Sequence, residues 1–372
     1  MLRTSIVVCA LMLAFGSYAA DADAASGTAA AKKAVEFLLS QQNEDGTFGK
    51  SKSAALPGMV GAALKALAGS PDKLRETNPQ VAKAAKYLLS KQQPNGSICL
   101  PEFGLENYNT SLAVIGLAAL ENPAYKPQLE KAKKFILSCQ LDEELGFKPD
   151  EHTRAYGAFG YGSSKRGDVS NTAFASEALK DLGLEEGSPA WKNAILFLKR
   201  SQDNDETNDA KEMKGGDNTG GFVYLPGDSE YGEVTSRSGK KLPKPYGNMT
   251  YQAIKSLIYA GMKKDEPTMQ AAFKWIKNNY SAKENPGGRG LQGFYYYSIA
   301  FSKAFTAMGI KELELADGRK VHWASDLATS LLSLQKPDGS FVNEDKRWME
   351  GDPVLATSFA LDALNLCIAG MK

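Results

Sequence analysis

One helical unit recurs six times along the chain, and a repeat of this size restricts the fold to stacked or ring-closed copies of that unit. Each unit has an amphipathic helix that ends near a glutamine, a glycine followed by an aromatic or other large residue, and a second, more apolar helix. The helix ends are Phe37–Gln42, Tyr87–Gln92, Phe135–Gln140, Phe197–Gln202, Trp275-Ile276 and Leu331–Gln335, and the turns contain Gly46, Gly96, Gly146-Phe147, Gly220–Phe222, Gly293-Phe294 and Gly339.

The two helices of a unit differ in where their apolar side chains lie. The first helices carry them on one face, as at Val81, Ala84, Ala85 and Leu88, which is typical of an outer layer. The second helices are apolar almost all round, because Leu112 to Leu120 has no polar side chain. A closed ring leaves no end unit exposed. We therefore predict an all-α (α/α)6 toroid with outer and inner helical rings, forming one domain over residues 25–372.

The N-terminus has the pattern of a secretory signal peptide over residues 1–24. Arg3 precedes an almost unbroken apolar run from Ser5 to Phe15, and small residues follow it. The run is shorter than the roughly 20 residues that span a bilayer. We expect an exported protein, periplasmic or secreted, with cleavage near Ala19 or Ala24.

Charge and cysteine content exclude several classes of protein. The 44 Lys+Arg and 43 Asp+Glu give a formal net charge of +1, which argues against a nucleic-acid partner. Four cysteines are too few for a disulfide scaffold of this length. We expect Cys99, Cys139 and Cys367 to be buried thiols, with a Cys99–Cys139 disulfide as the alternative.

The connections between the two helices of each unit indicate where a site lies. All of them fall on one rim of a toroid, and those from Gln140 to Asp168 and from Gln202 to Asn248 are much longer than the others. Long loops on a rigid scaffold are usually functional or disordered. The same rim receives the N-termini of the inner helices, whose free N–H groups favour negative or polar ligand atoms. We predict a site at this mouth.

The repeated units resemble the QW-type repeat of squalene cyclases. Together with Tyr246–Tyr251, Gly293–Tyr297 and Asp338–Pro353, they make residues 30–372 similar to the terpenoid cyclase and protein prenyltransferase superfamily, and especially to its exported bacterial members with prenyltransferase and squalene-oxidase repeats. The resemblance implies the α/α toroid and an aromatic-lined central cavity for an isoprenoid-like ligand.

The chain departs from the reactive motifs of that superfamily. Squalene cyclases protonate an alkene with the middle Asp of a D-x-D-D-T-A motif, and the matching segment here is Asp168–Ala173, with Ser170 and Asn171 in place of the second and third Asp. A hydroxyl and an amide cannot protonate an unactivated alkene. Prenyltransferases hold zinc with Asp, Cys and His, but His152 and His322 have no Cys at ligand spacing. We therefore expect no metal and no other cofactor.

Polar and aromatic residues near the starts of the inner helices are the candidate site. Asp168, Glu350 and Asp352 are the candidate acids or bases. The candidate ligand-binding residues are Tyr108, Asn109, Asn171, Asn248, Tyr251, Tyr296, Tyr297, Arg347 and Trp348. Helix capping by the Asp and Asn residues, core packing by the tyrosines and a structural ion cluster at residues 347–352 are the alternatives.

Two functions remain open. The first is an enzyme related to terpene cyclases or prenyltransferases, though not a standard squalene cyclase, that acts on an isoprenoid-like or other apolar ligand. The second is a non-catalytic cell-envelope protein that holds a lipid, glycan or peptide. A deep aromatic pocket with one carboxyl group of raised pKa favours catalysis, and a shallow polar mouth favours binding. Peripheral membrane contact and the oligomeric state stay open.

Overall fold

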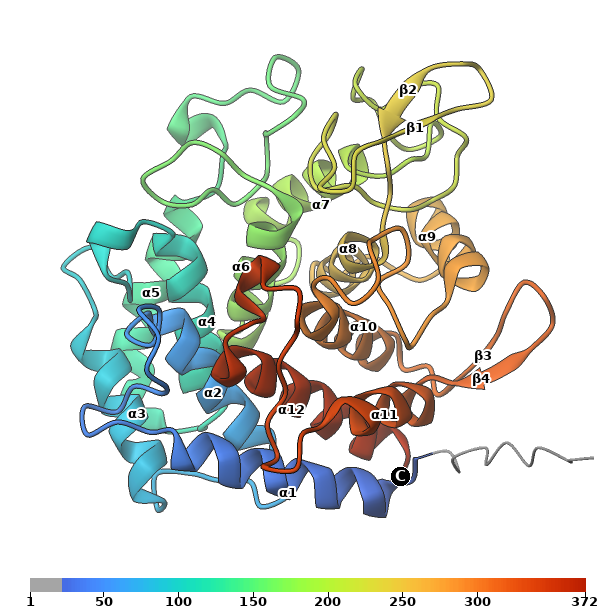
Figure 1. Cartoon of the computed structure of the whole chain (residues 1–372). Helices are drawn as coiled ribbons and strands as arrows, with labels where there is room; N and C mark the ends of the chain where they lie inside the picture. Colours follow the sequence, from blue (N-terminus) through green and yellow to red (C-terminus); the bar gives the residue numbers. More distant parts are fainter. Residues whose placement is uncertain (1–21) are drawn as a thin grey trace, which may run out of the picture.

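The computed structural model describes residues 22–372, so the predicted signal peptide lies almost entirely outside the described residues. Twelve α-helices alternate between two rings in this part of the chain (Figure 1). The outer helices are α1 (Ala24–Ser40), α3 (Pro79–Ser90), α5 (Lys126–Ser138), α7 (Pro189–Arg200), α9 (Pro267–Asn279) and α11 (Trp323–Leu334). The inner helices are α2 (Pro57–Gly69), α4 (Glu106–Ala118), α6 (Val169–Asp181), α8 (Gly247–Tyr259), α10 (Phe294–Met308) and α12 (Pro353–Gly370).

The inner helices form a closed ring. Each packs against the next, and α12 packs against both α2 and the first outer helix α1. The predicted (α/α)6 toroid is therefore confirmed. By length and composition α12 would suit a membrane span, but here it is an inner helix and most of it is buried.

The remaining elements are short. Four 3₁₀ turns are η1 (Pro101–Phe103), η2 (Pro123–Tyr125), η3 (Glu143–Leu145) and η4 (Arg347–Met349). Strand β1 (Glu233–Thr235) pairs antiparallel with β2 (Lys241–Pro243), and β3 (Glu312–Glu314) pairs antiparallel with β4 (Lys320–His322). The long α5–α6 and α7–α8 connections project from the same side of the ring, at the top of Figure 1.

The repeated glutamine links each unit to its neighbour. The Nε2 atom of Gln42 donates to the main-chain carbonyl of Gln80 on the next outer helix over 2.7 Å. The same bond joins Gln92 to Gln128, Gln140 to Ala190, Gln202 to Thr268 and Gln335 to Ala30. Because the last of these runs from the sixth unit to the first, one side-chain type both spaces the units and closes the ring.

The turn of the third unit differs from the predicted one. Gln140 pairs with Phe159, as Gln42 does with Phe48, so the turn of this unit contains Gly157. Gly157 has a φ of +87°, and a Cβ atom there would lie 2.0 Å from the carbonyl oxygen of Asn193 on the next outer helix. Gly146-Phe147, the predicted turn, belongs to an insertion that precedes it. In the fifth unit, Gly293 is the residue before α10 and not a turn of the repeat.

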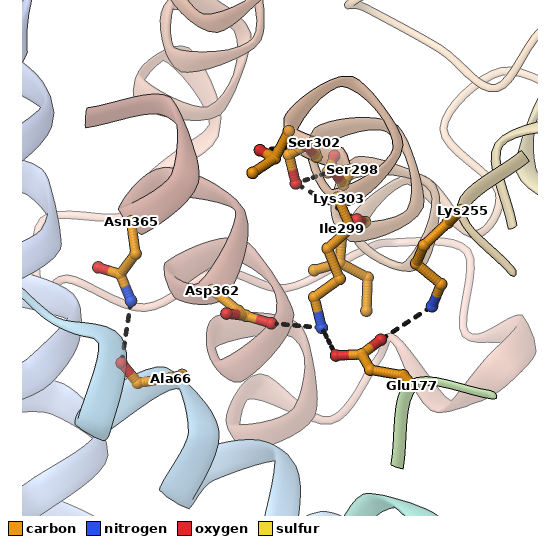
Figure 2. A network of polar contacts seen from close by, with 10 residues as sticks. Ala66, Glu177, Lys255, Ser298, Ile299, Ser302, Lys303, Asp362 and Asn365 are labelled. Carbon is orange, nitrogen blue, oxygen red and sulfur yellow. Dashed lines mark hydrogen bonds and ion pairs between the residues drawn. The ribbon is translucent and has the colours of Figure 1, made fainter. Parts of the chain in front are cut away.

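A buried charged cluster joins the inner helices around the axis of the ring (Figure 2). Glu177 of α6 accepts hydrogen bonds from the ammonium groups of Lys255 of α8, at 2.8 Å, and Lys303 of α10, at 2.6 Å. Lys303 also pairs with Asp362 of α12 at 2.9 Å. Although burial alone would raise the pKa of Glu177, the two ammonium groups hold it well below its usual range. The cluster therefore consists of charged groups held together in the core.

The three cysteines within the described residues are buried and free. The expectation of buried thiols is confirmed, and Cys99 and Cys139 do not form the alternative disulfide.

Candidate functional site

A cavity of about 520 Å³ lies at the predicted rim of the toroid, among the first turns of the inner helices. Aliphatic and thioether side chains form much of its wall, including Met59, Leu112, Met249 and Leu355. Six tyrosines complete it: Tyr108, Tyr161, Tyr224, Tyr231, Tyr246 and Tyr296. The cavity is therefore mainly apolar, with phenol hydroxyls distributed around it.

The repeat itself positions two of these tyrosines. Phe159 and Phe222 pair with the repeat glutamines Gln140 and Gln202, and Tyr161 and Tyr224 follow two residues later in each unit. The main chain of Phe222 is held further by its N–H, which donates to the Thr250 hydroxyl on the inner helix over 3.0 Å. The long connections thus place their tyrosines at the cavity wall through a rigid turn.

Asp168 lies behind these tyrosines and has no solvent exposure. It is the N-cap of α6, where its Oδ1 atom accepts from the Asn171 N–H over 2.8 Å. Its Oδ2 atom accepts from the Tyr161 and Tyr224 hydroxyls, each over 2.7 Å, and from the Asn171 amide over 3.3 Å. All four contacts come from donors, so the geometry suits a deprotonated carboxylate. Burial and the charge of Asp168 raise the pKa of both tyrosines, which therefore stay protonated.

One first-turn N–H group of each inner helix already has a partner in the protein, so fewer of these groups are free for the negative or polar ligand atoms that the sequence analysis expects there. Side-chain oxygens accept from first-turn N–H groups in five of the six inner helices. Asn109 accepts from Gly58 of α2, Asp168 from Asn171 of α6, Asn285 from Asn248 of α8, Glu350 from Tyr296 of α10 and Asp352 from Val354 of α12. The main-chain carbonyl of Tyr161 accepts from Asn107 of α4. These donors serve the fold and not a ligand.

Glu350 and Asp352 lie outside the cavity lining, contrary to their predicted role as acids. Glu350 is fully buried, where it accepts from the Tyr296 N–H over 2.7 Å and from the Asn343 amide over 2.8 Å. Burial raises its pKa to about 7, even though these hydrogen bonds oppose the shift. Both carboxylates act as helix caps because the adjoining connection places them directly over a first turn.

The pKa of Glu350 predicts a pH-dependent stability. Its folded-state pKa of about 7 lies above the reference value of 4.5, so the folded protein binds the proton more tightly than the unfolded chain. We expect the free energy of unfolding to fall by about 3 kcal/mol as the pH rises from about 4.5 to about 7. Urea unfolding at a series of pH values measures this slope. Glu350→Gln should make the slope shallower, since Asp181, whose pKa burial raises to about 6, still contributes a raised carboxyl pKa in this range, and Glu344→Gln, an exposed neighbour, should leave the slope unchanged. An unchanged slope in Glu350→Gln would contradict the assignment.

The structure divides the predicted ligand-binding residues into two groups. Tyr108, Asn109, Asn248, Tyr296 and Trp348 line the cavity. Asn171, Tyr251, Tyr297 and Arg347 do not. Tyr251 and Tyr297 are completely buried and pack against each other and Phe301, with ring centroids 5.0–5.7 Å apart. They are core residues because they face the interior between α8 and α10.

An ion pair between two connections lies at the cavity mouth. The Arg347 guanidinium is 2.6 Å from a carboxylate oxygen of Glu230, which lines the cavity, and 4.5 Å from the centroid of the Trp348 ring. Trp348 and Met349 have positive φ values of 59° and 63° and project exposed apolar side chains at this mouth. Backbone in this region is costly for such residues. The ion pair therefore joins the α11–α12 connection to the long α7–α8 connection.

Sequence reasoning missed Tyr161, Tyr224, Tyr231, Tyr246 and Glu230. A correct alignment of the third and fourth units would have revealed Tyr161 and Tyr224, because both follow the turn phenylalanine by two residues. Glu230 and Tyr231 lie inside the long fourth connection, where no repeat pattern indicates a position.

A ring of six helix pairs around an aromatic cavity, with that cavity at the N-terminal ends of the inner helices, defines an (α/α)6 toroid protein. Residues 57–225 match the squalene-hopene cyclase C-terminal domain, and residues 247–367 match the prenyltransferase alpha-alpha toroid domain. The chain belongs to the terpenoid cyclase-like superfamily. No curated protein sequence matches it.

Solved structures share this fold at low sequence identity. The type II terpene cyclase MstE from Scytonema is 14% identical with a TM-score of 0.56, covering 94% of this chain and 100% of that one. A protein from Actinoplanes is 18% identical with a TM-score of 0.53, covering 92% and 99%. A family 76 glycoside hydrolase from a bovine Bacteroides thetaiotaomicron strain is 10% identical with a TM-score of 0.56, covering 92% and 78%. These likenesses concern the fold alone.

Proposed function

We propose that the protein is exported and holds an isoprenoid-like or other apolar small molecule in its cavity, without protonating it. The wall of tyrosine, leucine and methionine side chains supports an apolar ligand, and the volume of about 520 Å³ is in the usual range for small-molecule sites. Variants of MstE are known in complex with geranylgeranyl dihydroxybenzoate, so this fold accommodates an isoprenoid chain in at least one relative.

The state of Asp168 is the observation that carries this proposal. Its carboxylate accepts from four donors and lies behind Tyr161 and Tyr224, which makes it a poor proton donor to a ligand. Ser170 matches the acid position of the squalene-cyclase motif that Asp168–Ala173 resembles, and its hydroxyl is 2.7 Å from that of Tyr296. Glu350, the carboxyl group whose pKa is raised to about 7, faces the first turn of α10 and not the cavity. Glu230 is the carboxyl group in the cavity lining, and it is paired with the Arg347 guanidinium over 2.6 Å, which favours its anionic form over a proton donor.

Squalene tests this proposal directly. The mature protein incubated with squalene in detergent should form no cyclic triterpene above the level of an Asp168→Ala control, as measured by gas chromatography of lipid extracts. The reason is that no strong acid reaches the cavity. Cyclic triterpene above that level would overturn the proposal.

Trp348 provides a signal for ligand entry. Of the four tryptophans it alone lines the cavity, and Trp191, Trp275 and Trp323 are buried in outer helices. Native mass spectrometry of protein from its own host should show a bound small molecule, which we expect to change Trp348 fluorescence. Tyr296→Ala and Trp348→Ala should each weaken binding about tenfold. Unaltered binding in both variants would place the ligand elsewhere.

The structured N-terminus bears on where the leader is cleaved. The Ala22 N–H donates to the Thr329 hydroxyl over 2.8 Å, and Asp23 caps α1 by accepting from Ser26. Cleavage near Ala24 would remove both contacts, whereas cleavage near Ala19 keeps them. We expect N-terminal sequencing of protein collected outside the cytoplasm to find a first residue before Ala22. A first residue after Asp23, or an intact leader, would contradict this.

A further inference from the structure

The two tyrosine hydroxyls beside Asp168 define what kind of group the cavity accepts. Tyr161 and Tyr224 each have one hydroxyl proton, and each lies 2.7 Å from the same oxygen of Asp168. The two hydroxyl oxygens are also 3.0 Å apart. When both protons point to the carboxylate, both phenol oxygens have only lone pairs left. The cavity wall then presents a pair of adjacent acceptors whose electron density is increased by the anion behind them.

The local charge favours a cation over a neutral donor. Asp168 has no ion-pair partner among residues 22–372. The N-terminus of α6 acts as about half a positive elementary charge and offsets part of the negative charge of Asp168. The guanidinium of Arg166 is exposed and 6.0 Å from the centroid of the Tyr224 ring. Lys346 lines the mouth but is exposed to solvent. Exposed charges are screened, so a negative potential remains at the base of the cavity.

Aromatic rings reinforce this preference. Six tyrosine rings line the cavity. Ring faces attract cations through their quadrupoles. The cation that the cavity lining offers to an anionic head group is Lys346, which is exposed at the mouth, because Arg347 is paired with Glu230.

We propose that the ligand held in this cavity is an apolar molecule with a protonated amine, whose N–H groups donate to the Tyr161 and Tyr224 oxygens. This inference rests on the proposed function and specifies its ligand class. An aliphatic amine is protonated at neutral pH, as the reference pKa of lysine shows.

Three probes with the same twelve-carbon chain separate the head-group chemistries: dodecylammonium, dodecanol and dodecanoate. Each is titrated into the mature protein by calorimetry at pH 7, below its critical micelle concentration. We expect dodecylammonium to bind at least tenfold more tightly than dodecanol, and dodecanoate to bind most weakly. Asp168→Asn keeps a side chain suited to cap α6 and removes the charge. It should bring dodecylammonium and dodecanol within about threefold of each other.

Asp352→Asn is the matched control, because Asp352 caps α12 from outside the cavity lining. It should keep the full preference for dodecylammonium. Circular dichroism melting shows whether both variants fold. Equal binding of the amine and the alcohol, tighter binding of dodecanoate, or a preference that survives in Asp168→Asn would overturn the inference. If none of the three probes binds, the proposed function itself fails.

Discussion

Replacing Lys303 with methionine is expected to lower the free energy of unfolding by about 3–5 kcal/mol. Among residues 22–372, Lys303 alone forms ion pairs with both Glu177 and Asp362, and its side chain is almost fully buried (Figure 2). Without its ammonium group, Asp362 loses its only ion-pair partner among the described residues, and Glu177 retains only Lys255. Uncompensated buried charge is costly because the interior solvates it poorly.

Urea unfolding followed by circular dichroism measures this loss, with Lys274→Met as the control. Lys274 is exposed on outer helix α9, so its replacement should change the free energy of unfolding by less than about 0.5 kcal/mol. The double variant Lys303→Met/Asp362→Leu should recover part of the loss, since it removes an unpaired carboxylate. A Lys303→Met protein as stable as the Lys274→Met control would show that the cluster does not support the ring.

Deleting the sixth unit, from Leu327 onward, is expected to give aggregated protein. The deletion removes α12, which packs against α1, α2, α10 and α11. It also removes Gln335, which bonds the sixth unit to Ala30 of the first. The apolar faces of α2 and α10 would then be open to water, and exposed patches of this size promote association. Size-exclusion chromatography and thermal melting measure the outcome.

A circular permutant is the control for chain ends. The two ends of the described chain lie close together, because Ala22 and Met371 line the same surface pocket. Joining Lys372 to Ala22 by a flexible linker, with new ends between Glu186 and Gly187 in the α6–α7 connection, keeps all six units. We expect this variant to be soluble and to melt cooperatively. A truncated chain that is equally soluble and cooperative would show that ring closure is not needed.

The ring could be predicted from the sequence because its causes are local and repeated. A one-sided apolar pattern as at Val81, Ala84 and Leu88 determines an outer helix, and an all-apolar segment such as Leu112–Leu120 determines an inner one. The glutamine at the end of five outer helices is visible in the sequence, and it bonds to the neighbouring unit in each case. Helix type, order and closure follow from such periodic patterns.

The site could be predicted only in part. The rim on which it lies and five of its lining residues could be predicted from the sequence, since the inner-helix starts must meet on one side of a toroid. The three candidate acids lie outside the cavity lining, and the sequence could not show this because Asp and Asn at a helix start serve equally well as caps or as ligand contacts. Glu350 and Asp352 turned out to be caps, and Asp168 is both a cap and the anion behind the cavity wall.

The sequence by itself determined the six helix pairs, their two layers and the absence of an acid at position 170. Only the tertiary structure decided which tyrosines enclose the cavity, that Tyr161 and Tyr224 share one carboxylate, and that Lys303 bridges Glu177 and Asp362 across three helices. The physical reason is distance along the chain. Periodicity reports the contacts that each residue makes with its own helix and the neighbouring unit, whereas these groups come from separate units and meet only when the ring has closed.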